Sequence, residues 1–262
     1  MLILNTIFLY DKMVGLFQRE SLCSMQITLF IIIILIASIL QTSTGFGFSI
    51  LATPFLLLLF EPAYAIQINL ILSFIISLAL ITTIQKDIRF DIIKRLLIGS
   101  LIGLPIGIVI FLQINPIFLK VSIGIIILTL TVLLILHYRM KQSKRKDTVV
   151  GALSGALTTS IGMPGPPLLL YFAGTKMDKE TLRGTTLAFY LFIYIISLLI
   201  QVVFAGTNPI VWKSSLYALP LVFIGLLIGQ KLFLRLNQQT FQICTYILLA
   251  FTGIYLLIES FG

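Results

Sequence analysis

The stretches QTSTGFG at residues 41–47 and TTSIGMPGPP at residues 158–167 interrupt two long apolar regions, residues 27–60 and residues 148–174. Glycine and proline in such places release backbone groups from helical hydrogen bonding. The arms on either side are about 12–15 residues long, short of the roughly 20 that a membrane-crossing helix needs. Each region therefore predicts a pair of short helices that folds back as a re-entrant hairpin or forms one broken span.

The composition predicts an integral membrane protein. Of 262 residues, 59% are hydrophobic and 10% are charged, whereas a soluble domain is about half apolar and about a quarter charged. The apolar residues form long runs and do not alternate with polar ones, which disfavours a membrane β-barrel. The fold class is therefore all-α, a polytopic protein of a lipid bilayer.

Six further apolar stretches have the length of a full membrane span. They lie near residues 64–84, 95–113, 117–138, 185–205, 215–234 and 240–260. The same order thus occurs twice, one broken pair followed by three spans, which predicts two related halves of four elements each. Residues at matching places in the two halves are Gly103 with Gly225, Gly107 with Gly229, and Asn115 with Asn237.

These elements divide the chain into four parts. They are an N-terminal segment at 1–25, a first membrane repeat at 26–138, a basic loop at 139–147 and a second membrane repeat at 148–262. The N-terminal segment has the pattern of a short amphipathic helix at the membrane surface.

The basic residues predict the orientation of the chain. Residues 139–146 carry five lysines and arginines, and such loops lie in the cytoplasm. If residues 148–174 were one broken span, the cations at 176–183 and 231–235 would lie outside. If they form a hairpin, those cations lie inside, which the same rule favours. Each half then crosses an odd number of times, so the halves would be inverted repeats with both chain ends outside.

Several classes of function are disfavoured by the residue types present. The formal charge of +9 is explained by cytoplasmic loops, so no nucleic-acid partner is expected. His137 is the only histidine, and Cys23 and Cys244 lack metal-binding spacing. We therefore expect no enzyme activity, no metal site and no cofactor.

The two breaks are the predicted binding site. Broken helices in duplicated transporters mark the substrate site near the membrane midplane, and the helix N-termini at Gly47 and Gly165 favour an anion. The candidate substrate-binding residues are Thr42, Ser43, Thr44, Gly45, Gly47, Asn69, Thr159, Ser160, Gly162, Gly165, Arg183, Thr185 and Thr186. In the alternative interpretation, the glycines only permit close helix crossing, the hydroxyls bond to their own helices, and Arg183 is a loop charge that sets topology.

The second break and its surroundings resemble the sulfite exporter TauE/SafE family, also called the toluene-sulfonate uptake permease family. The best agreement is GMPGPPLLLY at residues 162–171 and LRGTT at residues 182–186, with Gly45, Gly47 and Pro54 in the first half. The family commonly has a further glycine run where this chain has Phe48 and Ser49. The resemblance extends from about residue 26 to the C-terminus. It implies two related halves in the cytoplasmic membrane, transport of sulfur-containing anions, often as export, and no metal or organic cofactor.

Together these features predict a secondary transporter, more specifically an exporter, of small anions such as sulfite or organosulfonates across the cytoplasmic membrane. Its expected partners are the lipid bilayer and the anionic substrate, and homo-oligomerisation is left open. One alternative is a cation- or metal-coupled carrier. An alternative of another class is a non-transporting membrane scaffold for an enzyme partner.

Overall fold

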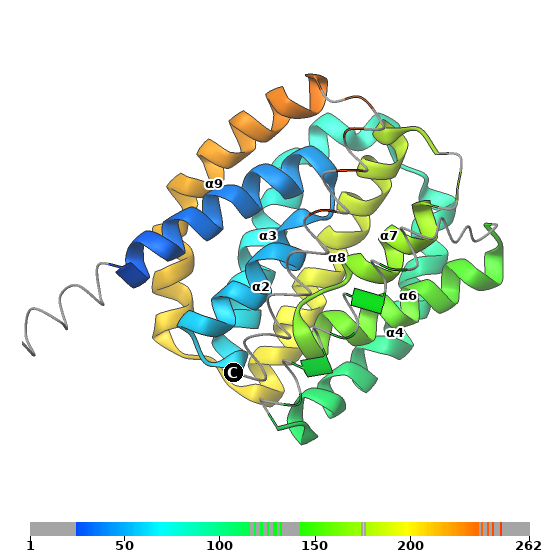
Figure 1. Ribbon diagram of the computed structural model, residues 1–262. Helices are drawn as coiled ribbons and strands as arrows, with labels where there is room; N and C mark the ends of the chain where they lie inside the picture. Colours follow the sequence, from blue (N-terminus) through cyan, green and yellow to red (C-terminus); the bar gives the residue numbers. More distant parts are fainter. Residues whose placement is uncertain are drawn as a thin grey trace, which may run out of the picture.

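The computed structural model describes residues 25–115 and 142–235, apart from residues 174 and 176, and isolated positions within 118–132 and 237–247. All regular elements in these residues are helical (Figure 1). They are an N-terminal helix (Met25–Thr44), α2 (Gly47–Leu59), α3 (Pro62–Ile84), the 3-10 turn η1 (Gln85–Asp87), α4 (Phe90–Gln113), α6 (Lys144–Ile161), α7 (Gly165–Ala173), α8 (Lys179–Ala205) and α9 (Pro209–Arg235).

Five of the described helices are long and apolar enough to cross a membrane: Met25–Thr44, Pro62–Asp87, Phe90–Gln113, Lys179–Ala205 and Pro209–Arg235. They confirm an all-α, multi-pass membrane protein, and four of them confirm the predicted spans near 64–84, 95–113, 185–205 and 215–234. The predicted spans near 117–138 and 240–260, and nearly all of the N-terminal segment, lie outside the described residues.

The first arm of the first broken region is longer than predicted. The helix Met25–Thr44 has 20 residues, so the expectation of an arm too short to cross was wrong there. The polar residues before the break do not end this helix, because Ser43 and Thr44 donate their hydroxyl hydrogens back to the carbonyl of Leu40 at 3.2 and 2.7 Å. In the second region, α6 has 18 residues and α7 only 9.

Both broken regions fold back on themselves. In hairpin 1, residues 25–60, the ring of Phe30 near the start packs against Phe60 at the end, with centroids 5.8 Å apart. In hairpin 2, residues 144–173, the hydroxyl of Tyr171 near the end donates to the carboxylate of Asp147 near the start at 2.5 Å. Residues 148–174 thus fold back in the structure, as the hairpin interpretation predicts, and their course through the membrane stays a prediction.

The basic residues gather at one end of the helix bundle, which we call the basic end. There Arg95 pairs with Asp147 at 2.6 Å, joining the starts of α4 and α6. The start of α8 adjoins the same region, because Thr185 accepts a hydrogen bond from the Arg89 N–H at 3.1 Å. The Lys179 ammonium donates to the Phe233 carbonyl near the end of α9 at 3.4 Å. These cations therefore lie at one end of the bundle, as the hairpin interpretation predicts, and their side of the membrane stays a prediction.

The two hairpins enter the bundle from opposite ends. Hairpin 2 has its base at the basic end, through the pair Arg95–Asp147. Hairpin 1 has its base at the other end, where Phe60 leads directly into α3. At that end Asn208 donates to the Tyr64 hydroxyl at 3.2 Å and Gln67 donates to the Gly206 carbonyl at 2.7 Å. This opposition is the geometry expected of inverted repeats, which nevertheless stay a prediction.

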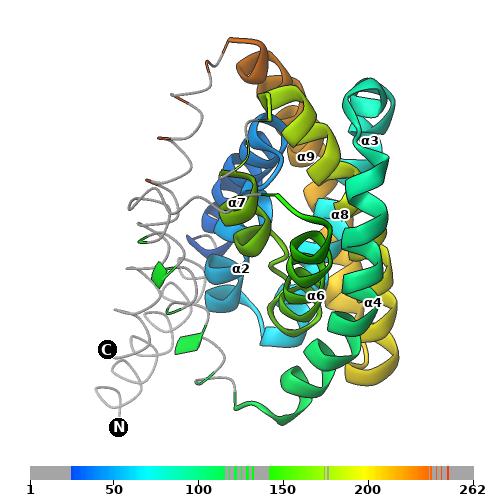
Figure 2. The same ribbon diagram turned by 90° about the vertical axis from the view of Figure 1, so that its right-hand side faces the viewer.

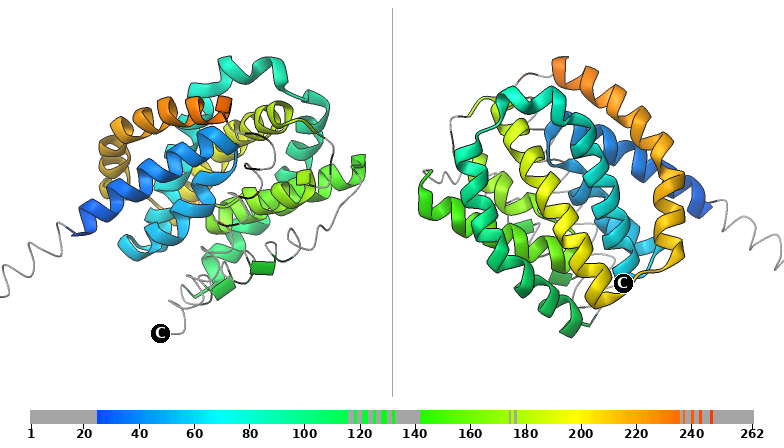
Figure 3. Two further views of the ribbon diagram at one scale, coloured as in Figure 1. Left: turned by 45° about the horizontal axis from the view of Figure 1, so that its top comes forward. Right: turned by 180° about the vertical axis from the view of Figure 1, so that it is seen from behind.

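Matching glycines join each half to the other half's hairpin. On α4, a Cβ at Gly103 or Gly107 would collide with the backbone of Ala152 or Ala156 on α6, and Figure 2 shows α4 and α6 side by side. On α9, Gly225 and Gly229 meet the N-terminal helix in the same way, at Ser38 and Thr42. Small residues let helix backbones approach this closely in membranes. Figure 3 shows α8 between α3 and α4 at the back of the bundle.

The helix α8 begins six residues before the predicted span. Asp178 is its N-cap and accepts a hydrogen bond from the Thr181 N–H at 3.0 Å, which holds the pKa of that carboxyl below its ordinary value. Arg183, Thr185 and Thr186 therefore lie inside a helix, in its first turns, and not in a connecting loop.

We expect Gly103→Leu to destabilise the protein. The atom in the way is the backbone carbonyl of Ala152, which cannot turn aside as a flexible side chain would. Overfilling a close contact costs about 1–3 kcal/mol, so the melting temperature in detergent should fall by several degrees. Ile106→Leu, at an exposed position of the same helix, is the control and should melt as the parent does. Equal melting of both variants would contradict the packing described.

Cysteine labelling should place three loops on two faces of the membrane. With Cys23 and Cys244 replaced by serine, Arg145→Cys and Glu180→Cys should react with an impermeant maleimide only after the cytoplasmic face is opened. Thr207→Cys, at the other end of α8, should react in intact cells. Reaction of Glu180→Cys in intact cells would overturn the hairpin topology.

Candidate functional site

Each hairpin tip is a glycine in the left-handed region. Gly45 has φ of 84° and Gly162 has φ of 72°, a conformation that other residues adopt only with strain. Each glycine N–H bonds to the carbonyl four residues earlier, Gly45 to Gln41 and Gly162 to Thr158, both at 2.8 Å. The two breaks thus share a left-handed glycine with the same N–H bond, at the end of similar sequences, TSTG at residues 42–45 and TSIG at residues 159–162.

The tip of hairpin 2 lies in a polar part of the bundle. The Asn69 amide on α3 donates to the Gly162 carbonyl at 2.7 Å. A Cβ built at Gly162 would lie 3.6 Å from the Thr53 hydroxyl on α2, so the tip lies close to this side chain. Three residues on, a Cβ at Gly165 would lie 3.0 Å from the Tyr190 hydroxyl. The tip of hairpin 2 therefore meets α2, α3 and α8 at once.

Four buried hydroxyls in this part of the bundle have no hydrogen-bond partner among the described residues. Thr53 on α2 and Tyr190 on α8 adjoin the tip, and Ser49 and Tyr194 lie one helical turn from them on the same two helices. We call these four the central hydroxyl cluster. The rings of Tyr190 and Tyr194 are 5.0 Å apart, and the Tyr194 hydroxyl lies near Ser49 and Ser73, outside hydrogen-bonding geometry. Leaving a buried hydroxyl unpaired costs about 1–3 kcal/mol, so four together indicate a place for a polar ligand.

The N-terminus of α2 adds backbone donors near the cluster. Its N-cap, Phe46, supplies no side-chain hydrogen bond, and the first N–H groups of a helix have no partner within it. Ser49 of the cluster lies in this first turn. The start of α7 offers fewer backbone hydrogen-bond donors, because Pro166 and Pro167 have no N–H. The expectation of N–H groups at both helix starts therefore applies mainly to α2.

Several predicted hydroxyls are already used by their own helices. Each donates to a carbonyl three or four residues earlier: Ser43 and Thr44 to Leu40, Thr159 to Gly155, Ser160 to Ala156, and Thr186 to Leu182. The Thr185 hydroxyl accepts from the Arg89 N–H. For the five that bond to their own helices, the geometry favours the alternative interpretation, that they satisfy local backbone and do not donate to a ligand. Thr185 bonds to backbone far along the chain and, as an acceptor, keeps its own hydroxyl hydrogen.

The remaining predicted residues form two groups. Asn69, Gly162 and Gly165 gather around the central hydroxyl cluster. Thr42, Gly45 and Arg183 lie toward the basic end, where a Cβ at Gly45 would be 3.3 Å from the Arg183 Cα. Gly47 packs against Leu40 across the turn of hairpin 1 and serves the fold of that hairpin. The thirteen predicted residues are therefore not one site.

All four members of the central hydroxyl cluster are missing from the sequence-based prediction. A signal for them exists: Ser49 and Thr53 are four residues apart on one short apolar helix, and so are Tyr190 and Tyr194 on a long one. This spacing places each pair on one helix face. Only the fold, however, brings the two faces together.

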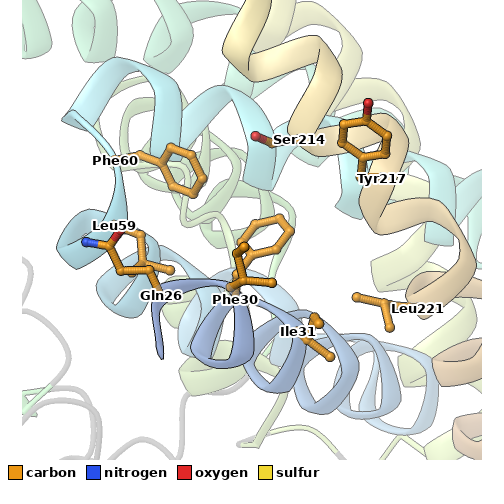
Figure 4. Close-up of a pocket in the computed structure, with 9 residues that line it drawn as sticks. Gln26, Phe30, Ile31, Leu59, Phe60, Ser214, Tyr217 and Leu221 are labelled. Carbon is orange, nitrogen blue, oxygen red and sulfur yellow. The ribbon is translucent and has the colours of Figure 1, made fainter. Parts of the chain in front are cut away.

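A groove outlined by the described residues lies elsewhere. It has a volume of about 450 Å³ at the base of hairpin 1, between the N-terminal helix, the end of α2 and α9 (Figure 4). Its lining is mainly apolar, with Phe30, Phe60, Tyr217 and Leu221 as the large side chains. An open apolar groove among lipid-facing helices lacks the donors that an anion requires, so we do not assign the binding site to it.

Within the described part of the chain, no three His, Cys, Asp or Glu side chains are grouped to hold a metal ion. Comparison with curated proteins gives no significant match, and comparison with solved structures gives none either. A sequence model of one family, described as sulfite exporter TauE/SafE, matches residues 30–256. This match spans both hairpins and most of the chain, so the protein belongs to the sulfite exporter TauE/SafE family.

Proposed function

We propose that this protein is a secondary transporter that exports a small sulfur oxyanion, sulfite or an organosulfonate, across the cytoplasmic membrane. Membership of the TauE/SafE family makes it a membrane transporter of the sulfite or anion type. The finer assignment of substrate class, direction and binding residues is our proposal.

One observation carries it: the four hydroxyls of the cluster, two of which adjoin the tip of hairpin 2, are buried and have no hydrogen-bond partner among the described residues. A sulfite or sulfonate group presents three oxygens on one sulfur atom, and each can accept a hydrogen bond from a hydroxyl. No cation of the described residues belongs to the cluster. Neutral donors suit a transporter, since a site must release its substrate as well as bind it.

The opposed hairpins supply a route for alternating access. The tip of hairpin 2 adjoins α2 of hairpin 1, where a Cβ at Gly165 would lie 3.3 Å from Ile50. In our proposal the halves are inverted repeats, and one rocks against the other around the site between the hairpins. The close contacts of Gly103 on α4 and Gly225 on α9 then move the hairpin of one half with the spans of the other.

A cation-coupled mechanism is the second candidate, and one observation favours it. The side-chain carbonyl oxygens of Gln41, Gln67 and Gln201 are buried and accept no hydrogen bond from the described residues. Gln201 also donates to the Thr159 carbonyl, in the last turn of α6, at 2.5 Å. Carbonyl oxygens at the C-terminal ends of half-helices are typical ligands of a coupling sodium ion.

Flux into proteoliposomes tests the binding site. We expect radiolabelled sulfite or ethanesulfonate to be transported by the parent protein. Thr53→Val, Tyr190→Phe and Tyr194→Phe each remove one donor and keep the shape. Each should raise KM about tenfold or more, because a hydrogen bond to a charged group contributes about 1.5–3 kcal/mol.

Tyr217→Phe is the matched control, since Tyr217 lines the apolar groove at the far end of hairpin 1, and its KM should not change. Gly165→Leu should abolish flux, because the new side chain would fill the space beside the Tyr190 hydroxyl. Normal cellular function of Gly165→Leu would instead support the scaffold alternative. Flux of Na⁺ or Ni²⁺ that is indifferent to sulfite would overturn the anion assignment.

A further inference from the structure

Arg183 is a buried cation that forms no direct ion pair with the described residues, and the carboxylates of Asp87 and Glu180 act on it only from a distance. Its residue is 3% exposed, and no carboxylate of the described residues lies within ion-pair distance of it. One terminal nitrogen, Nη2, donates to the Gln230 side-chain carbonyl at 2.6 Å. The guanidinium lies over the ring of Phe233, 4.1 Å from its centroid. The Nε–H has no hydrogen-bond partner among the described residues.

Arg95 shows how the same chain treats an ordinary arginine. It is partly exposed and still pairs with two carboxylates, Asp147 at 2.6 Å and Asp91 at 3.2 Å. An isolated charge in a low-dielectric interior is far more costly than a neutral group and is normally paired or hydrogen-bonded throughout. A neutral amide and an aromatic face compensate Arg183 only in part. Its free Nε–H therefore indicates a missing anionic partner.

The tip of hairpin 1 covers this arginine. A Cβ at Gly45 would lie 3.3 Å from the Arg183 Cα and 3.5 Å from its Cγ. Gly45 is two residues before the start of α2, whose N-terminus carries the positive end of a helix dipole and no side-chain cap. Arg183 itself is in the first turns of α8, at the basic end. The tip of hairpin 1 therefore lies directly over Arg183, and any side chain at Gly45 would crowd this contact.

We propose that Arg183 is a second anion-binding station, which holds the transported oxyanion on its way between the central hydroxyl cluster and the basic end. This inference rests on the proposed function and names its second site. Gln230 accepts one of the two Nη2 hydrogens and Phe233 lies against the plane of the guanidinium. The ligand edge is then formed by the Nε–H and the second Nη2 hydrogen. That edge suits two oxygens bound to one atom, as in sulfite or a sulfonate. The tip of hairpin 1 must move aside for the anion to pass.

Gln230→Glu is the sharpest test. It keeps the size and the hydrogen bond of Gln230 but places a carboxylate at the 2.6 Å contact, so the protein itself neutralises Arg183. We expect KM for sulfite and ethanesulfonate flux to rise at least about tenfold while the protein remains folded. In the parent protein ethanesulfonate should raise the melting temperature in detergent, and this shift should shrink in Gln230→Glu.

Arg183→Gln should act in the same direction as Gln230→Glu, and Arg183→Lys should be intermediate because it keeps the charge and loses the planar fork.

Lys231→Gln is the matched control. It neutralises an exposed cation on the neighbouring residue of α9, with the same change in net charge as Arg183→Gln, and should leave KM within about twofold, as expected for a screened surface charge. An equal effect of Lys231→Gln would mean that only the field of the basic end matters, which would overturn the station. A more stable Gln230→Glu protein with unchanged KM would also overturn the station, since Arg183 would then be purely structural.

If the hydroxyl variants raise KM and Gln230→Glu does not, the second station fails and the proposed function stands. Absence of anion flux in the parent protein would refute the proposed function itself.

Discussion

The structure depends on one constraint, that no backbone N–H or C=O can be left unpaired against lipid. Both hairpins break the helix inside the apolar part of the chain, at Gly45 and Gly162, and each break would expose such groups. The protein encloses both. The Gly162 carbonyl receives a hydrogen bond from Asn69 on another helix, and the tip at Gly45 lies directly against α8. A polar interior follows from this enclosure, because groups that satisfy a broken backbone must themselves be polar.

Close helix packing makes the enclosure possible. The glycines of α4 and α9 bring each hairpin's first arm into backbone contact with a span of the other half. Such contact replaces the hydrophobic driving force that is absent between helices in lipid. It also means that neither half is closed by its own elements. The hairpins enter from opposite ends and meet where α2 adjoins α7, so the interior polar groups belong to both halves together.

Polar side chains in this interior are treated in two different ways. Most hydroxyls near the breaks bond back to their own helices, as Ser160 does to Ala156, and contribute to local structure. A few have no protein partner, notably Tyr190 and Tyr194 at the centre and the Nε–H of Arg183 toward the basic end. The contrast between Arg95, paired with two carboxylates, and Arg183, paired with none, follows the same division. Unsatisfied donors, neutral at the centre and charged at the end, are the features on which the proposed anion path rests.

The sequence alone determined the membrane class, the four described full-length spans, the positions of both breaks and the family resemblance, because each depends on local composition, on glycine and proline, or on a contiguous motif. It also favoured the hairpin through the distribution of cations along the chain. Only the tertiary structure showed which residues come together at the proposed site. Whether Thr159 donates to its own helix or to a ligand depends on a neighbour 4 residues away, whereas the meeting of Thr53, Gly162 and Tyr190 depends on three segments far apart in the chain. Spacing along one helix predicts a shared face, but which faces come together is set by the packing of the whole bundle.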